Sequence, residues 1–514
     1  MRCCVVIGAG IGGLATAAVL ARRGVNVTVL EAQVYPGGCA GTFYHQGYRF
    51  DAGATLAGGL YPGGPMDLLA KSTGIKRWPA THAEPAMRVH LPNDTFIDRR
   101  GDEQRWQERL KVFGPQALDF WQWQERTADA MWDLALRLPS WPPNSVQDVT
   151  NLIQNGISWL GVGALQRMAM GIIQDAVQPV SRRLKGTSEN LRLFVDAQLL
   201  ISAQTTSQYA NALFGAAALD LPRRGVVHLD GGMGSMAQEL VQALERYGGE
   251  IHFRQEATRI VTEKGNPVAV ETKRGHHFDA DIIIFNLPAG NIATLITPNF
   301  ASGLREPKEK FADQWGAFVV YLGVDENVIP KDLPLHHQII TGRPLGEGNS
   351  VFLSISPSWD SGRAPQGKRA ITMSTHTRLE PWWQLHSEEP LAYKAKRARY
   401  AHALISSGER VLPGLRDAAE LVLPGTPATF ERFTGRAGGW VGGFPQTHLF
   451  RFRAPTLSRH IWMVGDSIFP GQSTAAVALG GLRVANMIFE EHFSRSHRSE
   501  GHPEVELPMT AGNY

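Results

Sequence analysis

Cysteine is scarce in this chain of 514 residues, which contains Cys3, Cys4 and Cys39 and no others. Neighbouring residues of a strand point to opposite faces, so Cys3 and Cys4 are poorly placed to pair. Three thiols so close together exclude a disulfide scaffold and provide no C-x-x-C redox motif. The chain also enters an apolar strand directly, without the regions that mark a signal peptide. We therefore expect a reducing, cytoplasmic location.

Charge of one sign and long apolar runs are also lacking. Lys and Arg number 51 against 48 Asp and Glu, a net charge of +3, which does not indicate a nucleic-acid partner. A membrane-spanning helix needs about 20 predominantly apolar residues. The nearest approach, residues 157–177, is interrupted by Gln166, Arg167, Gln174 and Asp175. The sequence thus predicts no spanning helix and leaves open a peripheral membrane contact through this segment, where Trp159 suits an interface.

What the chain does have is apolar material and a βαβ unit at its start. The hydrophobic fraction of 43% is enough for a large core, and the length fits two or three domains. Residues 3–8 and 25–30 predict strands on either side of a helix at residues 11–23. Strands that are apolar throughout, rather than alternating, are typical of a parallel sheet that is covered on both faces.

A G-x-G-x-x-G motif lies between the first strand and the helix. Gly8 permits the tight turn, Gly10 lets the backbone approach a pyrophosphate, and Gly13 allows close packing of helix and strand. Ile11 and Gly12 begin the helix, whose N–H groups favour a bound anion. Glu31 ends the second strand, near the spacing expected for a carboxylate that binds a ribose hydroxyl. Together these residues predict a dinucleotide site.

Further motifs indicate which dinucleotide is bound. Residues 35–42, YPGGCAGT, place Gly37 and Gly38 just after Glu31, and residues 47–53, GYRFDAG, follow. Near the other end, residues 464–477 read VGDSIFPGQSTAAV. With these motifs the chain resembles the FAD-dependent carotenoid desaturase and carotenoid isomerase family, within the larger group that includes amine oxidases. The resemblance covers nearly the whole chain and is strongest in residues 5–64, 225–261 and 425–488.

The resemblance implies FAD as cofactor and further contact residues. It places Gly37, Gly38 and Thr42 near the flavin side, an adenine contact at or near Ala257, and a closing FAD motif at Gly465, Asp466, Thr474, Ala475 and Ala476. A strand that ends at Gly465 presents Asp466 to hydroxyls, and a helix that begins near Thr474 aims N–H groups at the flavin pyrimidine. Cys39 departs from the arginine of amine oxidases and many phytoene desaturases, which disfavours an amine oxidase.

The predicted fold class is α/β, with a Rossmann-type FAD-binding domain assembled from three segments and interrupted by a mixed α+β substrate domain. We expect the FAD-binding domain at residues 1–66, 225–300 and 436–490, the substrate-binding domain at residues 67–224 and 301–435, and a flexible tail at residues 491–514. Tryptophan is dense in the first substrate segment, which suits a tunnel for a long apolar substrate, although core packing explains any single tryptophan as well.

The predicted function is that of an FAD-dependent oxidoreductase acting on an apolar polyene. A carotenoid desaturase of the 3',4' type is preferred, with a hydride passing to flavin N5 and electrons to an unidentified acceptor. The alternatives are a carotenoid cis-trans isomerase that uses reduced FAD, a flavoenzyme resembling retinol saturase or amine oxidase, and a non-catalytic prenyl-lipid carrier of the GDP-dissociation-inhibitor type.

The sequence identifies neither a catalytic residue nor a metal site. His276 and His277 lack spaced partner ligands and predict a solvated turn. Asp51 is open to two interpretations, a place near the flavin or a turn cap.

Overall fold

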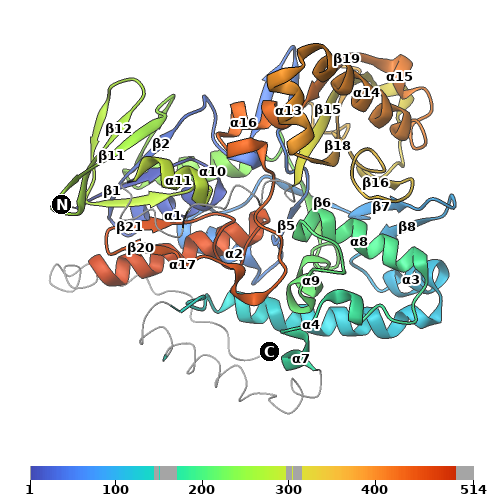
Figure 1. Ribbon diagram of the computed structural model, residues 1–514, viewed down its shortest axis with the longest axis horizontal. Helices are drawn as coiled ribbons and strands as arrows, with labels where there is room; N and C mark the ends of the chain where they lie inside the picture. The colour runs from blue at the N-terminus through green and yellow to red at the C-terminus, as the bar shows by residue number, and fades with distance from the viewer. Residues whose placement is uncertain (1, 144–149, 151–170, 297–303, 305–314, 494–514) are drawn as a thin grey trace.

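Three distant stretches of the chain build one six-stranded sheet in the computed structural model, which describes residues 2–143, 150, 171–296, 304 and 315–493 (Figure 1). The strand order is β10 (Glu250–Phe253), β2 (Asn26–Glu31), β1 (Cys3–Ile7), β14 (Ile282–Phe285), β21 (Ile461–Met463) and β20 (Thr456–Ser458). Neighbours from β10 to β21 run parallel, and β20 pairs antiparallel with β21. The parallel sheet predicted from the apolar strands is thus present.

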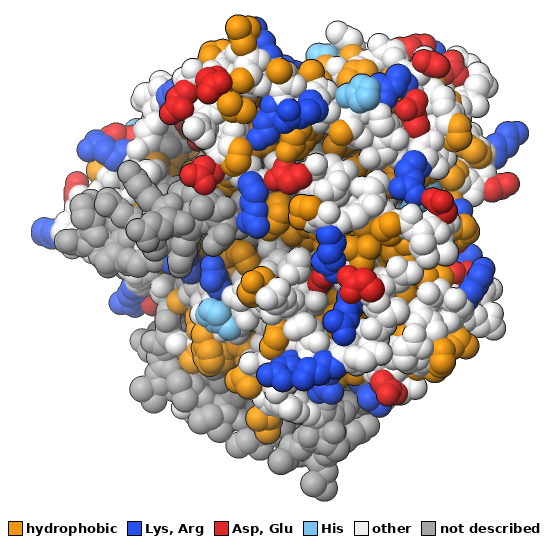
Figure 2. Space-filling view, turned by 45° about the vertical axis from the view of Figure 1, so that its right-hand side comes forward, with side chains coloured by type: hydrophobic (Ala, Val, Ile, Leu, Met, Phe, Trp, Pro, Cys, Tyr) orange, Lys and Arg blue, Asp and Glu red, His pale blue; other side chains and the backbone are white. Residues whose placement is uncertain are grey.

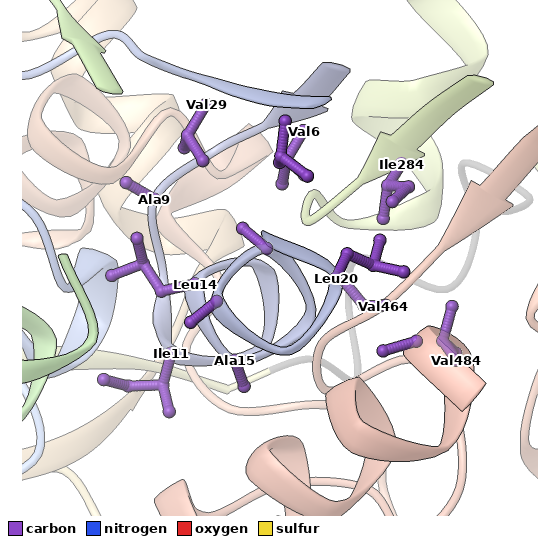
Figure 3. Close-up of a cluster of buried hydrophobic side chains, with 14 of the residues drawn as sticks. Val6, Ala9, Ile11, Leu14, Ala15, Leu20, Val29, Ile284, Val464 and Val484 are labelled. Carbon is purple, nitrogen blue, oxygen red and sulfur yellow. The ribbon is translucent and has the colours of Figure 1, made fainter. Parts of the chain in front are cut away.

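Helix α1 (Ile11–Arg22) lies at the centre of the core beside this sheet (Figure 3). It packs against α10 (Gly234–Arg246), α17 (Thr474–His492) and α2 (Pro65–Thr73). The contact with α17 is close because both helices carry glycine there: a Cβ atom on Gly481 would lie 2.6 Å from the carbonyl oxygen of Gly12. The hydroxyl of Thr16 donates to the carbonyls of Gly12 and Gly481 and adds a polar tie across the contact.

A second, seven-stranded sheet forms the other half of the molecule. Its order is β19 (Ala419–Gly425), β15 (Trp315–Asp325), β18 (Lys368–Arg378), β17 (Ser350–Ile355), β16 (His336–Ile340), β7 (Met87–His90) and β8 (Phe96–Arg99). All neighbours are antiparallel except β16 and β7. Helix α14 (Pro390–Gly408) covers one face, where Phe318, Ile371 and Met373 belong to a buried apolar cluster. The opposite face lines a cavity.

Helices from the middle of the chain close the remaining side. These are α3 (Gln104–Phe113), α4 (Leu118–Leu136), α8 (Glu189–Ala203) and α9 (Ala212–Ala218). Their packing is rich in aromatic rings, and Trp121 and Trp123 are buried within it. The smaller elements are β3 (Thr42–His45), β4 (Tyr48–Asp51), β5 (Ala57–Gly58), β6 (Ala80–Ala83), β9 (Val226–Leu229), β11 (Ala257–Glu263), β12 (Asn266–Thr272), β13 (His277–Asp279), α7 (Ile172–Asp175), α11 (Ala289–Leu295), α13 (Glu380–Glu388), α15 (Leu415–Ala418) and α16 (Pro427–Thr434).

The α/β class with a mixed second unit is confirmed by this arrangement and by the solved structures described below. The six-stranded sheet takes its strands from the predicted cofactor segments, and the seven-stranded sheet from the predicted substrate segments. A small sheet, β5–β9–β6, contains strands of both sets, so the exact domain boundaries stay a prediction.

Two predicted features fall partly outside the described residues. Of the apolar segment 157–177, residues 157–170 lie outside them, and α7 is its described helix. Helix α17 extends to His492, and the predicted tail from residue 494 onward lies outside them as well. Among the described helices, none is long and apolar enough to cross a membrane. His276 and His277 are exposed, as expected for a solvated position, but His277 is the first residue of β13 and does not lie in a turn.

Candidate functional site

A cavity of about 1090 Å³ is lined by residues of both sheets. It exceeds the range of roughly 300–1,000 Å³ usual for small-molecule sites. We call the lining residues within 87–222 and 317–376 the substrate half, and the remaining lining residues the cofactor half. Of the predicted cofactor contacts, the cavity is lined by Gly8, Gly10, Ile11, Gly12, Glu31, Gly37, Gly38, Ala257, Gly465, Asp466, Thr474 and Ala476.

The glycine turn is packed so tightly that side chains are excluded. Gly8 has a φ of +99°, in the region that favours glycine. A Cβ atom on Gly10 would lie 2.5 Å from Nδ2 of Asn286, and one on Gly13 would lie 2.4 Å from the carbonyl oxygen of Gly8. Gly13 does not line the cavity, and its role is the close helix–strand packing that the motif predicts. The turn therefore presents bare backbone to the cavity.

Asn286 is a residue that sequence reasoning missed. It follows β14, donates from Nδ2 to the carbonyl of Gly8, and would lie 3.0 Å from a Cβ atom on Gly465. It thus joins the first glycine turn to the closing motif from the third segment. The available signal was its position at the carboxyl end of a buried parallel strand, where ligands bind in open α/β sheets.

Glu31 is buried beside the turn and bound by backbone. Its two carboxylate oxygens accept from the N–H groups of Ala9 and Gln33, each at 2.8 Å. Burial raises the pKa of Glu31, and hydrogen bonds from the backbone of Gln33, Ala9 and Ala32 oppose that shift. A carboxylate offers about four lone-pair sites, so Glu31 can still accept from a ribose hydroxyl while it holds the glycine turn in place.

The loop after β2 lies against the glycine turn. The N–H of Gly37 donates to the carbonyl of Ala9 at 2.8 Å, and Gly37 has a φ of +114°. Cys39 lines the cavity, where burial raises the pKa of its thiol although nearby Arg436 lowers it. Thr42 is not part of the lining: its hydroxyl donates to Asp51 and accepts from the N–H of Gly234. The structure therefore gives Thr42 a role in anchoring α10 and does not support its predicted cofactor contact.

Asp51 has the same anchoring role. Its carboxylate accepts from Thr42, from the N–H of Met233 at 2.8 Å and from Arg363 at 3.0 Å. Asp51 is buried and lies outside the cavity lining. Of the two interpretations of Asp51, the structure therefore favours the turn cap over a place near the flavin.

The closing motif brings a charge pair to the cavity. Gly465 has a φ of +100°, and Asp466 next to it forms an ion pair with Arg436, at 2.9 Å between Oδ2 and Nη1. Arg436 also donates to the carbonyls of Trp440 and Gly442. Burial by itself would lower the pKa of Arg436, but Asp466 and Cys39 outweigh it and the pKa is raised. The arginine therefore stays charged beside the predicted hydroxyl-binding carboxylate.

The start of α17 completes this side of the cavity. Thr474 and Ala476 line the cavity, and Ser473, just before the helix, accepts from the N–H of Ala476. Ala475 is buried away from it, against Gly59, on which a Cβ atom would lie 2.8 Å from that of Ala475. Ala257 lines the cavity at the start of β11, in the same lining as Glu31. The individual cofactor contacts stay predictions.

These residues fit a dinucleotide. A bare glycine backbone at the start of a helix suits a pyrophosphate, a carboxylate lies at the end of β2, and a second carboxylate is held by a buried arginine on the third segment. The second glycine loop and the start of α17 extend the cofactor half beyond what a mononucleotide would require.

Comparison with known proteins decides the class. The family model described as flavin containing amine oxidoreductase matches residues 11–397. The chain belongs to this flavin-containing oxidoreductase family. Membership confirms the predicted enzyme class, an FAD-dependent oxidoreductase, and the predicted cofactor, FAD. It does not support the alternative of a carrier without flavin chemistry.

Similar proteins bear out the resemblance within the flavin-containing oxidoreductases. The chain is 27% identical over 503 residues to prolycopene isomerase 2 of an Oncidium hybrid cultivar, covering 94% of this chain and 83% of the relative. It is 25% identical over 519 residues to a lycopene-forming phytoene desaturase of a Paracoccus species, covering 95% and 97%. The predicted likeness to carotenoid desaturases and isomerases is thus confirmed.

Solved structures share the fold. An oxidoreductase from Methanosarcina mazei is 19% identical with a TM-score of 0.59, covering 94% of this chain and 100% of that one. The cyclohexylamine oxidase of Brevibacterium oxydans is 14% identical with a TM-score of 0.58, covering 95% and 99%.

Proposed function

We propose that the flavin-containing oxidoreductase described here acts on a long apolar polyene of the carotenoid type, most simply as a desaturase. The observation that supports this most directly is the continuity of the cavity. The same space that is lined by the glycine turn and Asp466 is also lined by Met131, Trp132 and Phe214. A cofactor in one half would therefore adjoin an apolar substrate in the other.

The substrate half suits a hydrocarbon. Further apolar residues there are Met87, Ile201, Leu221, Val319 and Phe352. Each CH₂ group that leaves water for such a surface gains about 0.8 kcal/mol. A polyene gains much from burial along this wall. A small cation such as an amine gains little, since the described residues of the substrate half offer it no carboxylate.

FAD, when bound, supplies the acceptor for a hydride. The residues of this chain would hold and orient it: the glycine turn and the start of α1 at the pyrophosphate, Glu31 and Asp466 at hydroxyls, and the start of α17 at the pyrimidine ring. The apolar wall would align the polyene and exclude water, which fixes the reacting carbons in one geometry.

Cis-trans isomerisation is the second candidate, because prolycopene isomerases match 94% of the chain at 27–28% identity. Isomerisation leaves the mass of the pigment unchanged and needs the flavin in its reduced form, whereas desaturation removes two hydrogens.

Expression in a host that accumulates carotenoids, followed by mass and retention analysis of the pigments, tests the proposal. Loss of two hydrogens supports the desaturase, and an unchanged mass with altered retention supports the isomerase. Unchanged pigments with flavin bound to the purified protein would refute a carotenoid substrate. The control is Gly10→Val, whose side chain would collide with Asn286 in the glycine turn.

We also propose a peripheral contact with a membrane surface near α7. Ile173 and Val177 are 70% and 83% exposed there, which is the kind of apolar surface that an interfacial helix buries among lipid headgroups. Elsewhere on the surface, positive and negative side chains intermingle on the face shown in Figure 2.

A further inference from the structure

His376 is the one titratable residue in the substrate half of the cavity, among the described residues. The other acidic, basic, thiol or phenol side chains of the lining, Glu31, Tyr35, Cys39, Glu256, Lys273, Glu431, Arg432, Arg436 and Asp466, all belong to the cofactor half. A desaturation releases a proton as well as a hydride, and no group in the proposed function accounts for that proton.

The sheet register places His376 on the cavity face of β18. Ser374 and His376 both line the cavity, whereas Met373 and Thr377 are buried on the opposite face. Side chains alternate between the two faces of a strand, so this pattern points the imidazole inward. His376 pairs with Ala317 of β15, which also lines the cavity.

A short series of contacts joins His376 to the cofactor half. Next to Ala317 on β15, Gly316 forms a bridge with Trp440, and the N–H of Val441 donates to the carbonyl of Trp315. The following residues approach the closing motif, since a Cβ atom on Gly443 would lie 2.8 Å from the carbonyl oxygen of Asp466. His376 is therefore one strand away from the segment that contacts Asp466.

The imidazole has no hydrogen-bond partner within the described part of the chain. The imidazole ring stands edge-on to the ring of Trp315, with 6.1 Å between the two centroids. The guanidinium of Arg378 stacks on Trp315, 3.9 Å from the centroid of that ring. The carboxylate of Glu347 is engaged by Thr377 and Tyr400 on the opposite face. Burial lowers the pKa of His376 to about 4. The ring is therefore neutral near pH 7, and a lone pair is free to accept.

We propose that His376 accepts the proton released when the polyene is desaturated. The inference rests on the proposed function and deepens it. Two C–H bonds of adjacent carbons break and one C=C bond forms. FAD, when bound, would supply the acceptor for one hydrogen with both electrons of its bond, and a ring nitrogen of His376 would take the other hydrogen as a proton.

A weak base is sufficient for this step. Once a hydride has left a carbon next to a polyene, the remaining positive charge makes the adjacent C–H bond strongly acidic. An imidazole that an apolar wall keeps neutral can accept that proton and later release it to water.

The test compares His376→Gln and His376→Ala with His337→Gln in the holoenzyme. His337 is a matched control because it is a buried histidine of the same sheet, its pKa is lowered to about 3, and it is absent from the cavity lining. We measure flavin content by absorbance, anaerobic flavin bleaching on mixing with a polyene, and product mass. A positioned base contributes about 10²–10⁴-fold to rate.

The proposal predicts normal flavin content and a loss of bleaching rate in that range for both His376 variants, with little change for His337→Gln. Added imidazole should restore part of the rate in His376→Ala, which a merely structural role would not produce. If His376→Gln desaturates the polyene at the wild-type rate, the proposed role of His376 is overturned and the desaturase assignment is not. A wild-type product of unchanged mass overturns the proton transfer together with the desaturase.

Discussion

Replacement of Arg436 by methionine should destabilise the protein and weaken FAD binding together. Methionine keeps much of the apolar volume but removes the ion pair with Asp466 and two hydrogen bonds to the carbonyls of Trp440 and Gly442. The side chains of Arg436 and Asp466 are only 12% and 16% exposed, but both line the cavity, so in the FAD-free protein water can partly replace the lost partner of Asp466. Breaking a fully buried pair costs about 3–5 kcal/mol, which is the upper limit expected for the loss of stability here.

The assay is denaturant unfolding of the FAD-free protein, with the dissociation constant of FAD measured by flavin fluorescence. Asp466→Asn and the double variant complete a cycle. Because the two side chains are in direct contact, we expect a coupling free energy of about 1–3 kcal/mol between them. Arg259→Met is the control, since it removes an exposed pair with Glu271 that water already screens.

Two outcomes would refute this reasoning. If the single variants add up to the double variant, the two side chains do not stabilise one another. If Arg436→Met unfolds as easily as expected but binds FAD as tightly as the wild type, the pair is structural and Asp466 does not meet the cofactor.

Three further predictions concern single positions. Gly13→Ala should lower the free energy of unfolding by about 1–3 kcal/mol in denaturant titrations, because its Cβ atom would lie 2.4 Å from the carbonyl oxygen of Gly8; a neutral result would contradict the close packing. Gly290→Ala in α11 should instead stabilise by about 0.5–1 kcal/mol, since no atom lies within 4 Å of its Cβ position, and a loss of stability would show a contact that the structure lacks. The pKa of His376 is about 4 in the folded protein and about 6.5 when unfolded, so between these values the unfolded chain binds more protons and stability falls as the pH falls. His376→Gln should flatten that fall by up to about 1.4 kcal/mol per pH unit, and identical pH profiles would place the imidazole in water.

The cofactor half was largely predictable from the sequence because its chemistry depends on local backbone. Gly8, Gly10 and Gly13 are neighbours in the chain, and the strand–turn–helix around them fixes their geometry before any distant contact forms. The same holds for Gly465 and Asp466 at the end of β21. By contrast, the family resemblance predicts Thr42 near the flavin side, and only the folded structure shows that its hydroxyl is engaged by Asp51 and by Gly234 at the start of α10.

The substrate half was not predictable to the same extent. His376 lies in β18, next to Ser374, Thr375 and Thr377, and these polar residues do not indicate which face of the strand is inward. The inward face is set by pairing with β15, some 60 residues earlier in the chain. Arg436 and Asp466 are distant in the chain, and only tertiary folding brings the two charges together. Asn286 carries no motif of its own and gains its role from the glycines of the first turn and from Gly465, all of which are distant from it in sequence.

The joining of α1 to α17 has a consequence for biogenesis. Because α1 packs against α17, which ends at His492, and β1 shares its sheet with β21, the nucleotide site cannot assemble until the residues through α17 have left the ribosome. During synthesis the apolar strands at the N-terminus must wait for their last neighbours. A nascent chain of this kind exposes apolar surface for longer than a chain whose domains fold one after another. We therefore expect chaperones to bind it until α17 docks.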